Sequence, residues 1–102
     1  MVKYSLRFAP EFLADLNGAT EFYDTKRVGL GKKFRSEVKS KLAIIKKSPH
    51  LYAIRHNDVR FALLEIFPCS IHFTIQQDLK QIWVYAILCQ YRNPDEYWIN
   101  FP

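Results

Sequence analysis

The second half of the sequence contains the side chains best suited to act on a phosphate group. Arg60 and Arg92 could hold phosphate oxygens through forked hydrogen bonds from their guanidinium groups. Tyr91, His72 or Glu65 could accept or donate protons. Metal-independent cleavage of RNA needs these types: a base for the 2′-hydroxyl, cations for the strained phosphate and an acid for the leaving oxygen. We would assign that chemistry to Arg60, Arg92 and Tyr91.

Several of these candidates also have a purely structural interpretation. An ion pair with Glu65 or Asp58 explains Arg60 nearly as well as phosphate binding does. His50 and His56 fall in expected loops, where an exposed side chain without a function is the better interpretation. The residue types therefore permit catalysis without requiring it.

The sequence lacks the motifs of other common enzyme sites. It contains no glycine-rich phosphate loop, no His-Glu-x-x-His and no serine or cysteine elbow. Cys69 and Cys89 lie in apolar, strand-like segments without metal-ligand spacing, so we expect two reduced packing residues. We expect neither a cofactor nor a metal.

Basic residues are concentrated in the middle of the chain. The formal net charge is +5, and the stretch 26–47 is rich in Lys and Arg, with Glu37 as its only acid. Such a one-sided field attracts a phosphate backbone or an acidic protein partner. A solvated helix face explains the charge equally well. The residues that we assign to partner binding here are Lys32, Lys33, Arg35 and Lys39.

Hydrophobic periodicity predicts the order of the secondary-structure elements. Residues 2–8 alternate as a strand does, and residues 10–27 repeat apolar positions at helical spacing. After a reversal permitted by Gly29 and Gly31, the helical period returns until Pro49. Short β-rich runs follow at residues 52–55, 59–67, 70–76 and 81–89, and their short connections predict an antiparallel meander.

The order β-α-α-β-β-β predicts an α+β fold. We expect a helical hairpin packed on one face of a small twisted antiparallel sheet. No linker, repeat or low-complexity tract divides the sequence, so residues 1–102 should form a single domain.

The last β-rich run predicts a strand with two different faces. They are Ile82, Val84, Ala86 and Leu88 toward the helices, and Trp83, Tyr85, Ile87 and Cys89 on the opposite side. A single domain rarely exposes such an aromatic patch without a partner, so we assign Trp83 and Tyr85 to partner binding. The alternative cover is the C-terminal stretch, where residues 92–98 could form a helical turn and Trp98 an anchor.

Length and composition indicate a soluble cytoplasmic protein without membrane contact. The chain has 102 residues, 49% of them hydrophobic, which is too apolar for disorder. No apolar run approaches the roughly 20 residues that span a bilayer. The first residues have charges within the apolar stretch and no small-residue cleavage site, so they do not resemble a secretory signal.

A series of short motifs resembles the RelE/ParE superfamily of small basic bacterial toxins along nearly the whole chain. In chain order they are Ala9-Pro10, Asp15-Leu16, Phe22-Tyr23, Gly31-Lys32-Lys33-Phe34, Pro49, Val59-Arg60, Phe67-Pro68, Arg92-Asn93-Pro94 and Trp98. Each motif alone is weakly specific. Their order and spacing together carry the resemblance.

The resemblance implies the toxin component of a type II toxin–antitoxin system. A small cognate antitoxin, encoded beside the toxin, would neutralise it by wrapping a flexible segment around it, and operator DNA would be contacted only through that antitoxin. ParE-like members of the superfamily poison DNA gyrase, whereas RelE-like members cleave mRNA on the ribosome. Arg60 and Arg92 match positions that are commonly basic in the superfamily.

One departure from the superfamily pattern favours the ParE-like mechanism over the RelE-like one. Many ribonuclease members have a His three residues before the terminal Arg, and Cys89 occupies that place here. We therefore expect a ParE-like toxin that binds DNA gyrase and is not an enzyme. The alternative is a RelE-like, ribosome-dependent endoribonuclease using Arg60, Arg92 and Tyr91. A third hypothesis is an inactive member that serves as a DNA-binding co-repressor.

Overall fold

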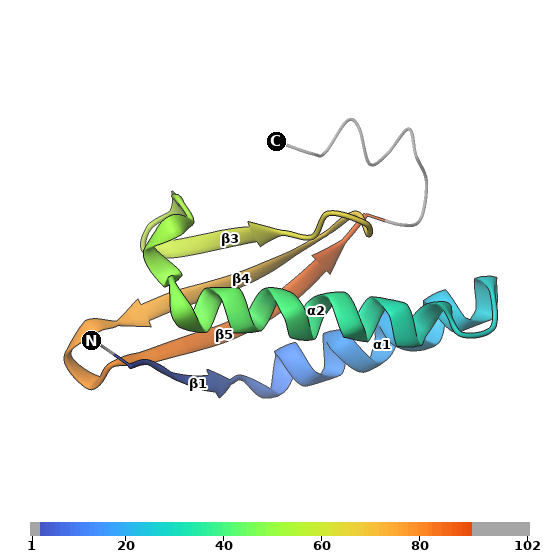
Figure 1. The fold of residues 1–102 in the computed structure, drawn as a ribbon, viewed down its shortest axis with the longest axis horizontal. Coiled ribbons are helices and arrows are strands. Elements are labelled where there is room, and N and C mark those ends of the chain that lie inside the picture. Colours follow the sequence, from blue (N-terminus) through green and yellow to red (C-terminus); the bar gives the residue numbers. More distant parts are fainter. Residues whose placement is uncertain (1–2, 91–102) are drawn as a thin grey trace.

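A layer of two helices packs against a five-stranded sheet in the computed structural model, which describes residues 3–90 (Figure 1). The elements are β1 (Ser5–Phe8), α1 (Pro10–Lys26), α2 (Leu30–Lys47), a 3₁₀ turn (Pro49–Leu51), β2 (Ile54–His56), β3 (Val59–Leu63), β4 (Cys69–Gln76), a second 3₁₀ turn (Gln77–Leu79) and β5 (Gln81–Cys89). The structure confirms the predicted α+β fold, although four strands follow the helices and the predicted order β-α-α-β-β-β counted three. The expected helical turn at 92–98 and the Trp98 anchor lie outside the described residues.

The strands are arranged in the order β1-β5-β4-β3-β2. The strands β2 to β5 form the antiparallel meander that the short connections predicted. At one edge, β1 pairs with β5 in parallel, with Ser5 opposite Gln81. The sheet is therefore mixed, because the chain passes through the helices and the meander before it returns beside β1. Alternation of apolar residues predicts a strand but carries no information about its direction.

The helical hairpin depends on two glycines for two different reasons. Gly29 precedes α2 with a φ of 87°, in the left-handed region that favours glycine. Gly31 lies where α2 approaches α1, and a Cβ added to it would meet the carbonyl oxygen of Thr20 at 2.5 Å. The N–H of Gly31 also donates to Asp24 Oδ1 at 2.8 Å. The predicted reversal thus combines a turn with a close helix contact.

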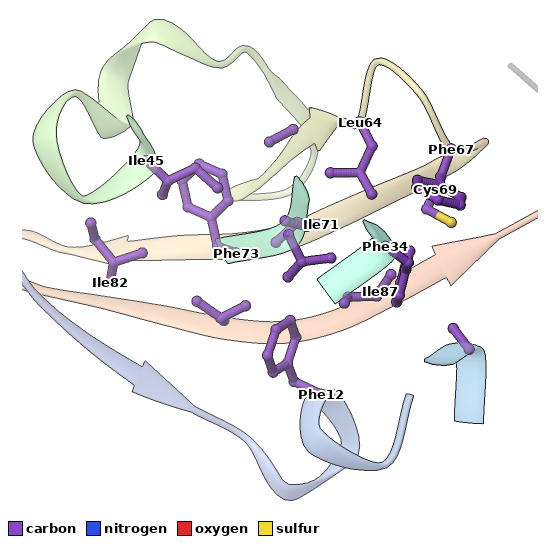
Figure 2. Close-up of a cluster of buried hydrophobic side chains, with 14 of the residues drawn as sticks. Phe12, Phe34, Ile45, Leu64, Phe67, Cys69, Ile71, Phe73, Ile82 and Ile87 are labelled. Atoms are coloured by element: carbon purple, nitrogen blue, oxygen red, sulfur yellow. The ribbon is translucent and has the colours of Figure 1, made fainter. Parts of the chain in front are cut away.

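The hydrophobic core lies between the helices and one face of the sheet (Figure 2). From α2, Phe34, Val38 and Ile45 are at most 2% exposed, and they recur on one side of the helix. The other fully buried side chains include Phe12 of α1, Ile71 and Phe73 of β4, and Ile82 and Val84 of β5. Both helices lie on the same side of the sheet (Figure 1).

A β-bulge interrupts the pairing of β5 with β4. Phe73 is opposite Val84, whereas His72 is opposite Ala86, so Tyr85 is the extra residue on β5. A bulge of this kind bends the strand and interrupts the alternation of its side chains.

Because of this bulge, the predicted faces of β5 are correct before Tyr85 and wrong after it. Ile87, which we expected on the open side, is 4% exposed in the core, while Leu88, which we expected under the helices, is 52% exposed. Ala86 is opposite His72 on the open side, so it does not face the helices as we expected. The pairing with β4 decides this reversal, and the alternation within β5 does not reveal it.

Cys69 and Cys89 form a disulfide, so the prediction of two reduced cysteines is wrong. They are directly opposite each other at the ends of β4 and β5, with their Cα atoms 4.0 Å apart. Cys69 is 4% exposed and belongs to the core, as a packing residue does. The two residues are 20 positions apart in sequence, and only the register of the two strands brings them together.

One carboxylate of α2 holds the loop between β3 and β4. Glu37 accepts hydrogen bonds from the backbone N–H groups of Glu65 at 2.8 Å, Ile66 at 2.9 Å and Phe67 at 3.2 Å. Successive N–H groups that point into one concavity form an anion site, and charge-assisted bonds of this kind are stronger than neutral ones. Glu37, the single acid of the basic stretch, therefore has a structural role in holding this loop.

Replacing Gly31 by Ala should destabilise the protein, because its Cβ would overlap the Thr20 carbonyl in the helix contact. We expect a loss of about 1–3 kcal/mol in the free energy of unfolding, measured by urea denaturation. Gly18→Ala is the matched control, since nothing lies within 4 Å of its added Cβ. The control should gain up to about 1 kcal/mol of helix stability. Equal effects of the two variants would contradict the close contact.

Replacing Glu37 by Ala should release the loop between β3 and β4. The three N–H groups lose their acceptor, so their hydrogen exchange should accelerate, and the unfolding free energy should fall by about 1–3 kcal/mol. Glu21→Ala removes the same charge from an exposed position of α1 and serves as the control. Unchanged exchange at Glu65 and Ile66 in the Glu37 variant would show that the carboxylate does not hold this loop.

Candidate functional site

The face of the sheet opposite the helices is the first candidate surface, which we call the open sheet face. Its side chains follow from the strand register, in which residues opposite each other share a face. They are Arg7, Phe61, Leu63, Ser70, His72, Thr74, Trp83, Ala86 and Leu88, together with the bulge residue Tyr85. No helix in the described part of the chain covers this face.

Trp83 and Tyr85, the aromatic residues assigned to partner binding, both reach the surface on the open sheet face. Trp83 is half-buried and Tyr85 is 41% exposed. The Thr74 hydroxyl, which is almost completely buried, donates to the Tyr85 hydroxyl at 3.5 Å. Thr74 is also the residue opposite Trp83 in the sheet, so both aromatic residues adjoin it. The pair offers an ordered aromatic surface, and exposed Leu88 extends it toward the end of β5.

His72 has the most unusual surroundings on this face. Its ring stacks on Phe61 with centroids 3.8 Å apart and an interplanar angle of 10°. Its Nε2 lies 2.9 Å from the Ser70 hydroxyl. Burial lowers the pKa of the imidazole below its usual value, and the Asp15 carboxylate offsets part of that effect. The ring is therefore mainly neutral at neutral pH and can accept a proton.

Arg60 lies on the other side of the sheet from His72. It is opposite Phe73, which is fully buried beneath the helices, and its Nη1 donates to the carbonyl oxygen of Tyr52 at 2.6 Å. The alternative that we gave for Arg60, an ion pair with an acid, is replaced by this bond, because Glu65 instead faces Lys41 at 3.7 Å. The structure therefore does not bring Arg60 beside His72. Its other expected partners, Tyr91 and Arg92, lie outside the described residues.

The exposed side of α2 is the second candidate surface, and the structure divides its four assigned basic residues into two groups. Lys32, Arg35 and Lys39 line a shallow depression of about 420 Å³ beside α1. Lys33 lines another, of about 650 Å³, together with Arg27 and the loop residue Ile66. The helix α2 packs on the side of the sheet away from the open sheet face (Figure 1). From the strand register and the lining of the depression, the aromatic pair and Lys32, Arg35 and Lys39 therefore belong to opposite sides of the sheet.

Asp15 is a site-positioning residue whose role the sequence did not reveal. β1 ends at Phe8, so the edge of β5 beyond Val84 has no neighbouring strand on that side. Asp15 Oδ2 accepts a hydrogen bond from the N–H of Ile87 at 3.3 Å and thereby satisfies this edge. The sequence drew attention to Asp15 only through the Asp15-Leu16 motif of α1. The backbone group that Asp15 binds follows from the β-bulge in β5, which the sequence does not show.

Metal binding and membrane spanning can be examined only for residues 3–90. There, no three His, Cys, Asp or Glu side chains come together as metal ligands. Neither helix in that range is long and apolar enough to cross a bilayer.

Comparison with known proteins shows similarity in structure without close similarity in sequence. No protein-family model and no curated protein matches the chain. A chain from the chromosomal ParDE TA system of P. aeruginosa superposes with a TM-score of 0.74 at 20% identity, covering 87% of this chain and 98% of that one. The intact E. coli RelBE toxin–antitoxin complex gives a TM-score of 0.67 at 18% identity, covering 87% and 99%.

The isolated E. coli RelE toxin is a further solved structure similar to this chain. Its TM-score is 0.68 at 17% identity, and the match covers 94% of each chain. The matched structures are about the same length as this chain, and all share its helical hairpin and sheet. The chain has the fold of the RelE/ParE toxin superfamily.

Proposed function

We propose that this chain is the toxin of a type II toxin–antitoxin system and that it inhibits growth by binding DNA gyrase. The observation that carries the proposal is the match over nearly the whole chain to structures from ParDE and RelBE systems. A cognate antitoxin neutralises the toxin, and operator DNA is contacted only through that antitoxin. Since the target is cytoplasmic, we place the toxin in the cytoplasm.

Two features of the described residues favour target binding over RNA cleavage. Cys89 takes the place where many ribonuclease members have a catalytic His, and its sulfur is bound to Cys69. In the disulfide-bonded state it therefore has no free thiol to transfer a proton. Arg60 is hydrogen-bonded to a backbone carbonyl on the helix side of the sheet, away from the open sheet face.

The second candidate function is RelE-like, ribosome-dependent cleavage of mRNA, for which Arg60, Arg92 and Tyr91 are the proposed catalytic residues. The observation in its favour is His72, whose neutral imidazole lies on the open sheet face beside the Ser70 hydroxyl. A neutral imidazole suits a general base at physiological pH.

The two candidate surfaces would bind antitoxin segments of different composition. Trp83 and Tyr85 would pack against apolar or aromatic side chains of the antitoxin. Lys32, Arg35 and Lys39 would pair with its acidic side chains. Because these surfaces belong to opposite sides of the sheet, a single antitoxin segment would have to wrap around the toxin to reach both. Such wrapping is the behaviour expected of a segment that folds on binding.

Gyrase action and RNA cleavage can be separated with the purified chain. We expect it to inhibit supercoiling by gyrase and to leave ribosome-bound mRNA intact in primer extension, because Cys89, at the place of the usual His, is bonded to Cys69. An Arg60→Ala variant should still inhibit supercoiling by gyrase. Cleaved mRNA with normal supercoiling would defeat the gyrase proposal in favour of the RelE-like function. Normal growth during unopposed expression would instead support an inactive co-repressor.

Ala substitution of Trp83 or Tyr85 should weaken the complex with the antitoxin encoded beside the toxin. Buried aromatic residues often dominate interfaces, so we expect a loss of about 2 kcal/mol, roughly a thirtyfold rise in Kd, in a calorimetric titration. Val28→Ala is the control, since Val28 is 96% exposed in the turn between the helices. If all three variants bind as the wild type does while remaining folded, the antitoxin uses another surface.

A further inference from the structure

The disulfide lies at the end of the sheet where β4 begins and β5 ends. Cys69 begins β4 and Cys89 ends β5. Next to this cross-link, the N–H of Gln90 donates to the carbonyl oxygen of Pro68 at 2.9 Å. The bond therefore closes the last paired position between β4 and β5, close to exposed Leu88 on the open sheet face.

The two sulfur atoms have unequal surroundings. Cys69 is 4% exposed and packs within the core cluster that also contains Phe67 (Figure 2). Cys89 is only half-buried. Thiol–disulfide exchange requires in-line approach of a thiolate to one sulfur, so access selects which sulfur is attacked. Here access favours Cys89.

A hydroxyl group lies beside the sulfur that would leave. The Tyr23 hydroxyl of α1 is 3.6 Å from Cys69 Sγ, within hydrogen-bonding range for sulfur. Tyr23 is itself buried, and its ring packs against Phe67 with centroids 4.7 Å apart, which fixes the direction of its hydroxyl. A hydrogen bond to a developing thiolate stabilises it and makes it a better leaving group.

We propose that Cys69–Cys89 is a site of thiol–disulfide exchange at which a dithiol reductant attacks Cys89 and Tyr23 assists the departure of Cys69. One thiolate of the dithiol bonds to Cys89 Sγ, the Cys69–Cys89 bond breaks, and its electron pair goes to Cys69 Sγ. The second thiolate of the dithiol then attacks its own sulfur in the mixed disulfide and releases Cys89. The protein gains two electrons and two protons, and the dithiol becomes a disulfide.

The chemistry of the compartment gives this exchange a role. In the reducing cytoplasm, where we place the protein, disulfides are usually transient and catalytic or redox-sensing. Reduction removes the cross-link at this end of the open sheet face, and we expect the Gln90 N–H to exchange with solvent more quickly. The inference does not depend on whether gyrase or mRNA is the target.

The first experiment measures the order of attack. In Cys69→Ala only Cys89 remains, and in Cys89→Ala only Cys69 remains, so each variant can be titrated with the disulfide reagent DTNB. We expect Cys89 to react several-fold faster than Cys69, because its sulfur is more accessible. Equal rates, or a faster Cys69, would overturn the proposed direction. Alkylation of both cysteines in the untreated wild-type protein would overturn the disulfide itself.

The second experiment tests Tyr23. Reduction of the oxidised wild type by dithiothreitol, followed by quenching and mass spectrometry, should slow roughly tenfold in Tyr23→Phe, which keeps the ring and removes the hydroxyl. Tyr85→Phe removes a hydroxyl from the open sheet face and should leave the rate unchanged. The melting temperatures of the oxidised variants report any packing change separately. Equal rates in Tyr23→Phe and the wild type would remove Tyr23 from the proposal.

The third experiment measures the consequence of reduction. The reduced wild type, and Cys69→Ala/Cys89→Ala, should melt roughly 10 °C or more below the oxidised protein, since a closed loop of this length stabilises by restricting the unfolded chain. Hydrogen exchange at Gln90 should accelerate in both. Identical melting and exchange in the two redox states would contradict a conformational role for the disulfide.

Discussion

Burial of the apolar side of α2 against β4 and β5 is the interaction on which the rest of this structure depends. Phe34, Val38 and Ile45 meet the inward side chains of β4 and β5, and each contributes about 1.5–3 kcal/mol by leaving water. The two helices bury one face of the sheet along β4 and β5, whereas β2 at the edge stays exposed. The same packing that stabilises the core therefore leaves the opposite face without a helix over it in the described part of the chain, and places the basic outer surface of α2 on the other side of the sheet.

Directional polar contacts then fix what hydrophobic burial cannot specify. Burial is roughly proportional to area and has no preferred geometry, so it does not determine the path of a loop or the edge of a strand. Glu37 determines the path of the loop between β3 and β4, because its carboxylate accepts hydrogen bonds from three backbone N–H groups of that loop. Asp15 satisfies β5 where β1 has ended. Asp15 and Glu37 therefore have structural roles within a strongly basic chain.

The fold does not by itself distinguish gyrase binding from RNA cleavage. RelE-like and ParE-like proteins share this architecture, and function resides in the side chains that the architecture displays. On the open sheet face these are an aromatic pair, Trp83 and Tyr85, and a stacked, neutral His72. The bonded Cys89 and the position of Arg60 on the other side of the sheet are the two observations that support our proposal of target binding.

The sequence by itself determined the order of elements, the helical hairpin and the inward residues of α2, because period, Gly and Pro act over a few neighbouring positions. The bounds of β5 and the surface location of Trp83 and Tyr85 also followed from local alternation. Only the tertiary structure decided the parallel pairing of β1, the bulge at Tyr85, the Cys69–Cys89 bond and the side of the sheet on which Arg60 lies. Each of these depends on the register between strands distant in sequence, and a pattern within one strand carries no information about its neighbour.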